Sequence, residues 1–323
     1  MKANRFIAHG AASVLLAFSA TAAFATTYPS GPITFVVPFS AGGGADTAAR
    51  ILAQGVEKVT GQKVIVDNRP GASGTVGASA VLRAKPDGQT VFYDASSFAI
   101  NAVLRDLPYD PNKDFKPVTQ AVVVPNILVV AANSPYMTLD DLLEAGKKAP
   151  GKHTYASYGP GSLAQMAGEL LKKESGVDLL HIPYKGGAPA MVDVMGGHVD
   201  SYFANAASSL GHVNGGKLRA LAVTSEQRMK ELPNTPTMIE AGIADFTVYE
   251  WNGLFVPAQT PDAIVDQLAK ILQQAVALPE VQEKLMLLGL SAVASSPKEF
   301  AEFLQSEQVR WSEVAKANGI KLN

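Results

Sequence analysis

Cysteine is absent from all 323 residues of the chain. Its absence excludes thiol catalysis, cysteine-ligated zinc and disulfide bonds together. Histidine is scarce as well, and no two of the histidines beyond residue 25 are three or four residues apart: His153, His181, His198 and His212. Because two metal ligands on one helix face need that spacing, the sequence predicts no helical metal site. A chain without cysteine also suits export, since it cannot form wrong disulfides in an oxidising compartment.

Charged residues are few, at 17% of the chain, and neither sign is in clear excess. The 27 Lys and Arg residues nearly balance the 29 Asp and Glu residues, so the basic stripe of a nucleic-acid binder is missing. No long run of one charge indicates a disordered tail. The length and the 47% hydrophobic content instead predict a soluble globular protein of about two domains.

The common nucleotide and nucleophile motifs are also missing. The glycine-rich stretch 42–47 lacks the third glycine of a dinucleotide-binding fingerprint, and no Gly-Lys-Ser/Thr sequence provides a phosphate loop. Residues 71–74, Gly-Ala-Ser-Gly, lack the residue that a nucleophile elbow requires between the serine and the second glycine. We therefore predict no cofactor, no metal and no catalytic residue.

The first 25 residues have the pattern of a secretory signal peptide. Lys2 and Arg5 supply a short basic start, residues 11–24 are almost all apolar or small, and Ala23 and Ala25 stand at the cleavage-specifying positions. An uncleaved anchor is the alternative, although the apolar run is short for a membrane span. With no lipid-attachment cysteine, we expect cleavage near Ala25 and a protein free in the periplasm. Cleavage removes two positive charges, leaving 25 against 29 and a net charge of −4 over 298 residues.

Strand and helix signals alternate along the mature chain. Residues 33–37 are a short β-branched run, 46–59 carry apolar residues at helical spacing, and 63–66 have the composition of the next strand. The alternation recurs further along the chain, over residues 153–171, 179–195 and 199–213, with one more strand at 218–224. Repeated strand–helix–strand units predict a parallel sheet covered on both faces.

The last third of the chain is mainly helical. Thr260-Pro261 predicts a helix with threonine at the N-cap and proline as its first residue. Residues 296–299, Ser-Pro-Lys-Glu, predict a capping box that opens a final amphipathic helix. Asp140 and Asp141, just after Thr138, indicate first-turn charge on another helix and not an acid/base pair.

Two apolar extended stretches are long enough to cross from one domain to another. They are residues 118–132 and 248–257. We interpret them as paired crossovers, which makes the first domain discontinuous. It then comprises residues 26–124 plus 250–323, with residues 125–249 forming the second domain.

Three strand-to-helix turns are rich in glycine: residues 38–47, 157–162 and 183–187. Glycine permits close backbone approach, and the helix that follows offers unpaired N–H groups at its positive end. A carboxylate or phosphate can bind there without a basic side chain. We expect an anion held between two domains, with tight turns that bind nothing as the alternative for any one loop. Asp46 is either a ligand contact or ordinary first-turn charge.

Six motifs occur in the order in which one family of receptors carries them. They are PFSAGGGAD at 38–46, DNRPGA at 67–72, LPYD at 107–110, HIPYKG at 181–186, GKLRALA at 216–222 and WNGL at 251–254. On this set the chain resembles the periplasmic solute-binding receptors of tripartite tricarboxylate transporters, also called the Bug family. The resemblance covers essentially the whole mature chain. It implies an α/β fold of the type II periplasmic-binding-protein kind, with two lobes closing on a small organic carboxylate.

The resemblance also implies contacts to the ligand from both lobes. In the first lobe they fall on Phe39, Ser40, Ala41, Gly42, Gly43, Asp46, Ser96 and Ser97. In the second lobe they fall on Gly159, Gly161, Ser162 and Asn205.

Two positions depart from the family pattern. Gln165 stands where histidine is common and completes a capping box with Ser162, so Ser162 either contacts the ligand or serves its own helix. Ala204 stands where aspartate is common before Asn205. This change removes an acidic group that would recognise a ligand ammonium.

The resemblance implies a monomeric, non-enzymatic receptor that delivers its ligand to the membrane subunits of a tripartite tricarboxylate transporter. A receptor for amino acids such as aspartate or glutamate is one alternative, and a ligand-sensing partner of a signalling system is another. A secreted hydrolase is more distant, because the sequence shows no nucleophile, base and orienting acid at suitable spacing.

Overall fold

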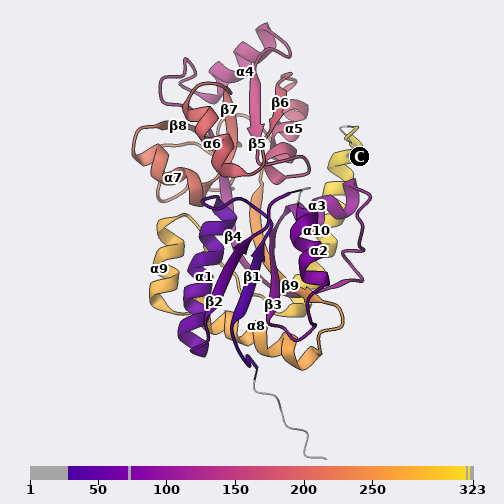
Figure 1. The fold of residues 1–323 in the computed structure, drawn as a ribbon. Coiled ribbons are helices and arrows are strands. Elements are labelled where there is room, and N and C mark those ends of the chain that lie inside the picture. Colours follow the sequence, from indigo (N-terminus) through magenta and orange to yellow (C-terminus); the bar gives the residue numbers. More distant parts are fainter. Residues whose placement is uncertain (1–27, 72–73, 318, 321–323) are drawn as a thin grey trace, which may run out of the picture.

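The computed structural model describes residues 28–71, 74–317 and 319–320 of the chain. Figure 1 shows two α/β parts stacked end to end. We call them lobe 1, which contains β1 to β3 and the last helices, and lobe 2, which contains β5 to β8. The predicted signal peptide, residues 1–25, lies outside the described residues. Across the described ranges, no helix combines the length and apolar character that crossing a membrane requires.

The sheet of lobe 1 has the strand order β2-β1-β3-β9-β4. β1 pairs in parallel with β2 and β3, as predicted, whereas β9 is antiparallel to β3 and β4, and β10 is antiparallel to β4. The strand bounds are Ile33–Val37 (β1), Val64–Asn68 (β2), Thr90–Ala95 (β3), Phe115–Ala131 (β4), Tyr249–Pro257 (β9) and Ser291–Ala292 (β10).

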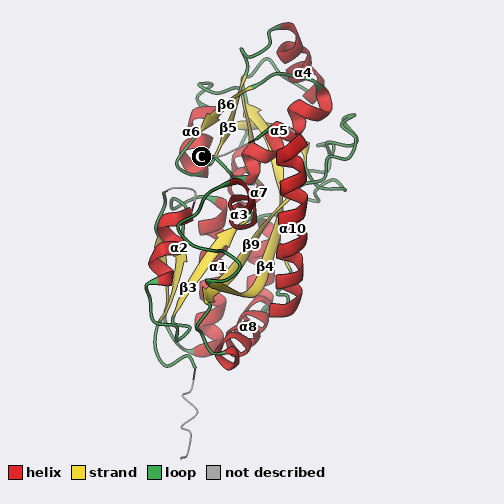
Figure 2. Ribbon diagram, turned by 90° about the vertical axis from the view of Figure 1, so that its right-hand side faces the viewer, coloured by secondary structure: helices red, strands yellow, loops and turns green. Residues whose placement is uncertain are grey.

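Helices cover both faces of this sheet. α1 and α8 pack together over one face, where Leu52 and Leu268 are fully buried. α2, α3 and α10 cover the other face over an aromatic cluster that includes Phe92, Phe98 and Phe255. Figure 2 shows α10 running along the lobe beside the sheet. The bounds are Gly44–Thr60 (α1), Thr75–Leu82 (α2), Ser97–Leu104 (α3), Asp262–Val276 (α8), Pro279–Leu287 (α9) and Pro297–Ala317 (α10).

Of two predicted helix starts, one is confirmed and the other is wrong by one residue. The capping box of α10 is confirmed, because Glu299 N–H donates to Ser296 Oγ over 3.2 Å and Ser296 N–H donates to the Glu299 carboxylate over 2.8 Å. The predicted N-cap of α8 is wrong by one residue, since Pro261 is the cap and Asp262 the first helical residue. The Pro261 carbonyl already accepts from the N–H of Ile264 and Val265, so the first turn begins after the proline.

Lobe 2 continues the sheet in the order β4-β7-β5-β6, with β8 also paired to β4. β5 is parallel to β6 and β7, as the repeated units predicted. α4 opens with a capping box between Thr138 and Asp141, which confirms the first-turn role of that acid. The bounds are Leu139–Lys148 (α4), Thr154–Ser157 (β5), Leu163–Ser175 (α5), Leu180–Pro183 (β6), Gly187–Met195 (α6), Ser201–Asn205 (β7), Ala206–Asn214 (α7) and Leu218–Val223 (β8).

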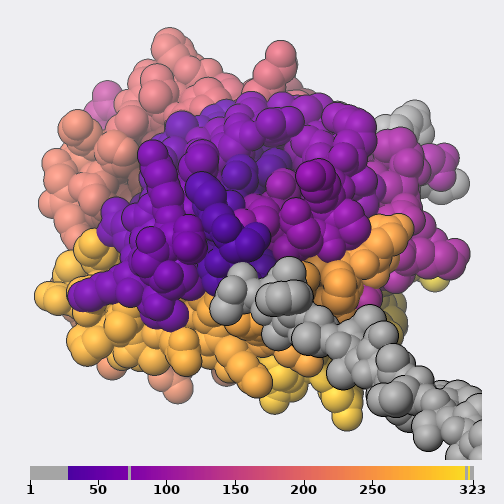
Figure 3. Space-filling model, turned by 60° about the horizontal axis from the view of Figure 1, so that its bottom comes forward, coloured from indigo at the N-terminus to yellow at the C-terminus, as the bar shows by residue number. Residues whose placement is uncertain are grey.

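β4 and β9 connect the two lobes. β4 pairs with β9 as far as Pro125, and from Asn126 it pairs with β7 and β8. The predicted boundaries therefore fall where β4 changes partner, and we propose that residues 26–124 plus 250–323 form lobe 1 and residues 125–249 form lobe 2. Figure 3 views the lobe 1 end, whose surface is shared by indigo-to-purple and orange-to-yellow parts of the chain.

Candidate ligand-binding site

The three glycine-rich turns meet where the two lobes face each other. Ser40 Oγ in the first turn donates a 2.7 Å hydrogen bond to the carbonyl of Lys185 in the third turn. Phe39 packs edge-to-face on Tyr158 of the second turn, with ring centroids 5.9 Å apart. Gly186 has a φ of +125°, and a Cβ there would lie 2.8 Å from Ser40 Oγ, so this contact requires glycine. The structure therefore brings the turns together with the lobes in contact.

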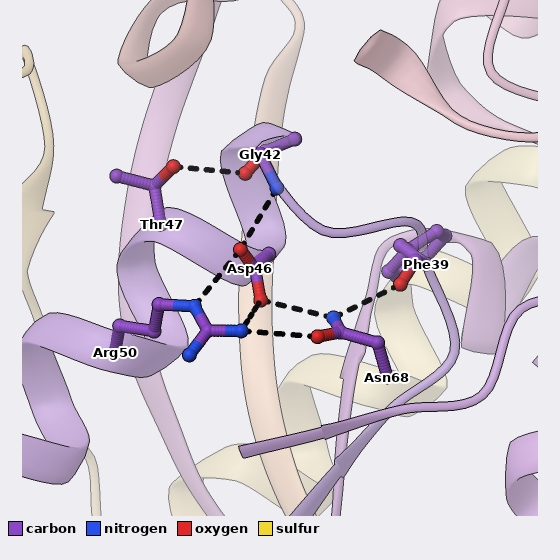
Figure 4. Close-up of polar contacts among 7 residues, drawn as sticks. Phe39, Gly42, Asp46, Thr47, Arg50 and Asn68 are labelled. Carbon is purple, nitrogen blue, oxygen red and sulfur yellow. Dashed lines mark hydrogen bonds and ion pairs between the residues drawn. The ribbon is translucent and has the colours of Figure 1, made fainter. Parts of the chain in front are cut away.

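The side chain of Asp46 stabilises the conformation of the first turn. Its carboxylate accepts from Gly42 N–H and from Asn68 Nδ2, each over 2.9 Å, and it pairs with Arg50 one turn along α1. Asn68 also donates to the Phe39 carbonyl, as Figure 4 shows. Burial raises the pKa of Asp46, but the hydrogen bonds from Arg50, Gly42 and Asn68 outweigh it and leave the pKa below its usual value. The carboxylate is therefore occupied in holding the shape of the turn.

A small inner cavity of about 30 Å³ lies between the lobes beside the start of α1. Lobe 1 lines it with Phe39, Gly43, Gly44, Ala45 and Ala95, together with Glu250 and Asn252 of β9. The first backbone bond of α1 runs from Thr47 N–H to the Gly43 carbonyl, so the N–H groups of Gly44 and Ala45 have no acceptor within the helix. The positive end of α1 therefore borders the cavity.

Lobe 2 closes the inner cavity with Tyr158, Gly187, Tyr202, Asn205 and Ser208. α6 begins at Gly187 and α7 begins directly after Asn205, so the amino-terminal ends of two more helices reach the cavity. Asn205 Oδ1 caps α7 by accepting from Ala207 N–H over 3.0 Å. A Cβ on Gly44 would lie 2.5 Å from the Asn205 side-chain amide, so the two lobes approach closely at this point.

Several polar groups of the second turn form hydrogen bonds with one another. Gly161 N–H donates to Gln165 Oε1 over 2.7 Å, and Gln165 N–H donates to Ser162 Oγ over 3.3 Å. The expected pairing of Ser162 with Gln165 is present, although the Gln165 side chain reaches back to Gly161 and not to Ser162. We conclude that these groups stabilise the start of α5.

Ser96 and Ser97 are buried and bonded to their own surroundings. Ser96 Oγ accepts from Trp251 N–H, and Ser97 Oγ donates to the Asp94 carboxylate, each over 3.1 Å. The loop after β3 reaches the inner cavity through Ala95.

Among the residues expected from the resemblance, Phe39, Gly43 and Asn205 line the inner cavity, and Gly159 lines the outer cavity described below. Ala41 and Gly42 lie exposed at the tip of the first turn.

Glu250 lines the inner cavity and was missed by the sequence analysis. It is 2% exposed at the start of β9. The Tyr158 hydroxyl donates to Glu250 Oε2 over 2.6 Å and accepts from Leu163 N–H over 3.1 Å. Burial raises the pKa of Glu250 to about 7, although Tyr158 and Ser96 favour its charged form. A signal was available, because Glu250 is the only charged residue in the apolar stretch 248–257.

Asp94 is a second buried acid, 2% exposed near the end of β3. Burial raises its pKa to about 7, against hydrogen bonds from Ala95 N–H and Ser97 Oγ. The charge of Asp94 also contributes to the raised pKa of Glu250. Two buried carboxyls thus titrate near neutral pH on the adjacent strands β3 and β9.

A larger outer cavity of about 240 Å³ shares Phe39 and Tyr158 with the inner one. Arg105 and Lys185 contribute to its walls. Arg105 Nη2 donates to the carbonyl of Pro160 over 3.0 Å, which forms another hydrogen bond between the lobes. Two cationic residues here favour the approach of anions. Within the described ranges, no cluster of three or more His, Asp or Glu side chains is placed to hold a metal ion.

Known proteins provide an independent comparison. The model of the tripartite tricarboxylate transporter family receptors matches residues 48–320 of the chain. Protein BugT of Bordetella pertussis is 34% identical over 318 residues, which cover 96% of this chain and 98% of BugT.

Solved structures extend the similarity to the fold. The periplasmic binding protein BugD aligns with a TM-score of 0.87 at 35% identity, covering 91% of this chain and 99% of BugD. A protein of R. palustris, solved with adipate, aligns with a TM-score of 0.88 at 32% identity over 91% of this chain and 99% of its own. These alignments confirm the predicted periplasmic-binding-protein fold.

Proposed function

The chain belongs to the tripartite tricarboxylate transporter receptor family, and from this premise we propose that it captures a small organic carboxylate outside the cytoplasm. The bound solute is then delivered to a membrane transporter of the tripartite tricarboxylate type. The resemblance inferred from the six sequence motifs is confirmed at the level of the family. The adipate held by the R. palustris protein supports a carboxylate as the class of ligand.

The observation that carries the proposal is the position of α1 against the inner cavity. The N–H groups of Gly44 and Ala45 have no acceptor within α1, and both residues line the cavity. The described residues that line this cavity include no Lys, Arg or His. A carboxylate is therefore bound by backbone donors and the helix dipole, through charge-assisted hydrogen bonds.

Ligand entry requires the lobes to separate. The inner cavity is enclosed by residues of both lobes, which approach closely beside it at Gly44 and Asn205. The lobes are connected by β4 and β9, and they touch through Ser40 with Lys185 and Arg105 with Pro160. We propose that the lobes open and close about these two strands, as in other hinged binding proteins.

A serine–histidine contact bears on the hydrolase alternative. Ser157 Oγ lies 2.6 Å from His181 Nε2. Ser157 is fully buried, and its hydroxyl also contacts the carbonyl and N–H of Gly159, so it shapes the second turn. Burial lowers the pKa of His181 to about 4. Because no substrate reaches this serine, we propose a receptor without enzymatic activity.

The amino-terminal pattern supports export of the chain. We propose that the mature protein begins at Thr26 and resides in the periplasm, in line with the periplasmic location of BugD. Amino-terminal sequencing of protein recovered from the periplasmic fraction tests this. A membrane-bound form that retains Met1 would contradict it.

A thermal-shift screen tests the ligand class. The purified protein is melted with succinate, malate, citrate, adipate and L-aspartate, with glucose as an uncharged control. A ligand at 100 times its Kd adds roughly 2.7 kcal/mol to the free energy of unfolding, so at least one carboxylate raises the melting temperature clearly. No shift with any carboxylate in the panel would overturn the proposed ligand class. Uptake of the best ligand by cells with and without the gene then tests the transport role.

A further inference from the structure

The inner cavity contains a buried carboxyl group with one oxygen unengaged. Oε2 of Glu250 accepts from Tyr158, and Ser96 also favours the charged carboxylate, but Oε1 has no partner at hydrogen-bond geometry within the described part of the chain. Asn252, two residues further along β9, is fully buried and lines the same cavity. Its side-chain oxygen and nitrogen likewise have no partner among the described residues. Buried polar atoms without partners are costly, so this cluster favours a ligand that supplies them.

No opposite charge faces Glu250 across the inner cavity. The titratable groups that interact with it are the Tyr158 hydroxyl, Tyr202, Tyr93 and Asp94, which are neutral phenols or another acid. The residues that line the cavity include no Lys, Arg or His in the part of the chain that the structure describes. An ionised Glu250 therefore has to obtain its counter-charge from the ligand.

We propose that Glu250 makes this receptor selective for carboxylic acids that also carry a hydrogen-bond-donating nitrogen, such as an ammonium group. The ligand nitrogen donates to Glu250 Oε1, while the N–H groups at the start of α1 hold the ligand carboxylate. Asn252 contributes a neighbouring amide to the same ligand. This inference rests on the proposed receptor function and specifies the ligand class of its site.

Charge balance determines whether the amino acid or the plain dicarboxylate should bind more tightly. A plain dicarboxylate adds negative charge beside Glu250 and forces that carboxyl to take up a proton, because two like charges are not stable together in a buried site. An amino acid satisfies both ends of the site at once. A site built around a hydrogen bond to one ligand group strongly rejects the analogue that lacks the group.

Calorimetric titration with matched ligand pairs tests this selectivity. The purified chain is titrated at pH 8 with succinate and L-aspartate, with glutarate and L-glutamate, and with adipate and 2-aminoadipate. Each pair differs only in one amino group. We expect the amino member of the best-binding pair to bind at least tenfold more tightly than its partner. The preference should shrink at pH 5, where Glu250 is protonated.

Glu250→Gln is the diagnostic variant, because it keeps the size of the side chain and removes its charge. It should lower the preference for the amino ligand at least tenfold and bind the plain dicarboxylate no more weakly than the parent chain. Asp94→Asn is the matched control: it alters a buried acid that does not line the inner cavity and should change the preference less than threefold. Circular dichroism confirms that each variant is folded.

The possible outcomes separate this inference from the receptor function. If the parent chain prefers the plain dicarboxylate and Glu250→Gln weakens it, Glu250 is a neutral donor to a carboxylate, and the selectivity is wrong while the receptor function stands. An unchanged preference in a folded Glu250→Gln variant would also refute it. If Glu250→Gln does not fold, Tyr158→Phe, which removes the hydrogen bond to Oε2, replaces it and should alter the preference between pH 5 and pH 8. Failure of all six ligands and of the thermal-shift panel would overturn the receptor function itself.

Discussion

The Tyr158 hydroxyl donates a 2.6 Å hydrogen bond to Oε2 of Glu250 and so connects the second glycine turn of lobe 2 to β9. Tyr158 also receives the N–H of Leu163 at the start of α5, and its ring packs on Phe39 of the first turn. One side chain therefore contacts both cavities, a helix start and the strand that connects the lobes. We infer that the charge of Glu250 and the closure of the lobes depend on each other through this residue.

Stability should respond to pH through Glu250. Burial raises its pKa in the folded chain to about 7, above the ordinary value of 4.5, so the folded state holds a proton that the unfolded state releases between these values. The resulting stability is full below about pH 4.5 and lost as the pH rises through about 7. Glu250→Gln removes this titrating group. The change that it causes in the free energy of unfolding should therefore be more stabilising at pH 8 than at pH 4.5, by on the order of 3 kcal/mol. Thermal melts of both proteins at the two pH values measure the difference.

Comparing the two proteins at the same pH removes the contribution of titrating groups that do not interact with Glu250. His181 acts in the opposite direction, since its lowered pKa makes the folded chain more stable as the pH rises from about 4 to 6.5. An equal difference in melting temperature at pH 4.5 and pH 8 would mean that Glu250 is not held in a proton-binding environment.

Asp46→Asn should destabilise the protein by about 1–3 kcal/mol at pH 7, because Arg50 and the Gly42 N–H lose a charged acceptor. The pKa of Asp46 is lowered in the folded state, so its contribution is present above about pH 4 and lost as the pH falls further. Urea denaturation at pH 7 and pH 3 measures this. Asp262→Asn, in the first turn of α8, is the control: Asp262 is exposed, and its loss should cost less than about 0.5 kcal/mol.

Gly44→Ala should weaken ligand binding more than tenfold, because its Cβ would stand 2.5 Å from the Asn205 amide of the opposite lobe. Asn205 is fixed as the cap of α7 and has little freedom to move away. The effect on unfolding should be small, since alanine is favoured in a helix. Gly211→Ala in α7 is the matched control, because a Cβ there meets no atom within 4 Å. Equal affinities of the two variants would show that the close approach of Gly44 to Asn205 does not matter for binding.

Lobe opening should be visible by small-angle X-ray scattering. The contacts of Ser40 with Lys185 and of Arg105 with Pro160 belong to the closed arrangement. We expect the ligand-free protein to have a larger radius of gyration than the protein saturated with the best ligand of the thermal-shift panel. Gly44→Ala should stay expanded at the same ligand concentration. Identical scattering with and without ligand would argue against a hinge at β4 and β9.

The fold was largely predictable because its signals are local. Short β-branched runs such as residues 33–37 became strands, and the apolar spacing through Leu52 became the buried face of α1. The crossover at Pro125 was recognisable from its length and apolar character. The cap of α8 was not, because one residue of shift between Thr260 and Pro261 depends on which carbonyl accepts the first helical bond.

The candidate site was predictable only as a region. The three turns could be named because glycine marks them, but which polar groups remain free depends on three-dimensional neighbours. The Gly161 N–H donates to the Gln165 side chain. The Asp46 carboxylate accepts a hydrogen bond from Asn68 and pairs with Arg50. Glu250 lies in a stretch that the sequence analysis interprets as a crossover between domains, and only the strand register places its side chain against the cavity.

The role of backbone donors at α1 is the central claim, and one titration series tests it. Ala45→Pro removes the N–H of a residue that lines the inner cavity, yet proline is tolerated in the first turn of a helix, so α1 should still form. Lys185→Ala removes the only cationic side chain in the three turns, and the contact of Lys185 with Ser40 uses only its carbonyl. Calorimetry with the best carboxylate of the panel should show Ala45→Pro binding at least tenfold more weakly than the parent chain and Lys185→Ala within tenfold of it. Loss of binding in Lys185→Ala, with full affinity in a folded Ala45→Pro, would contradict the account.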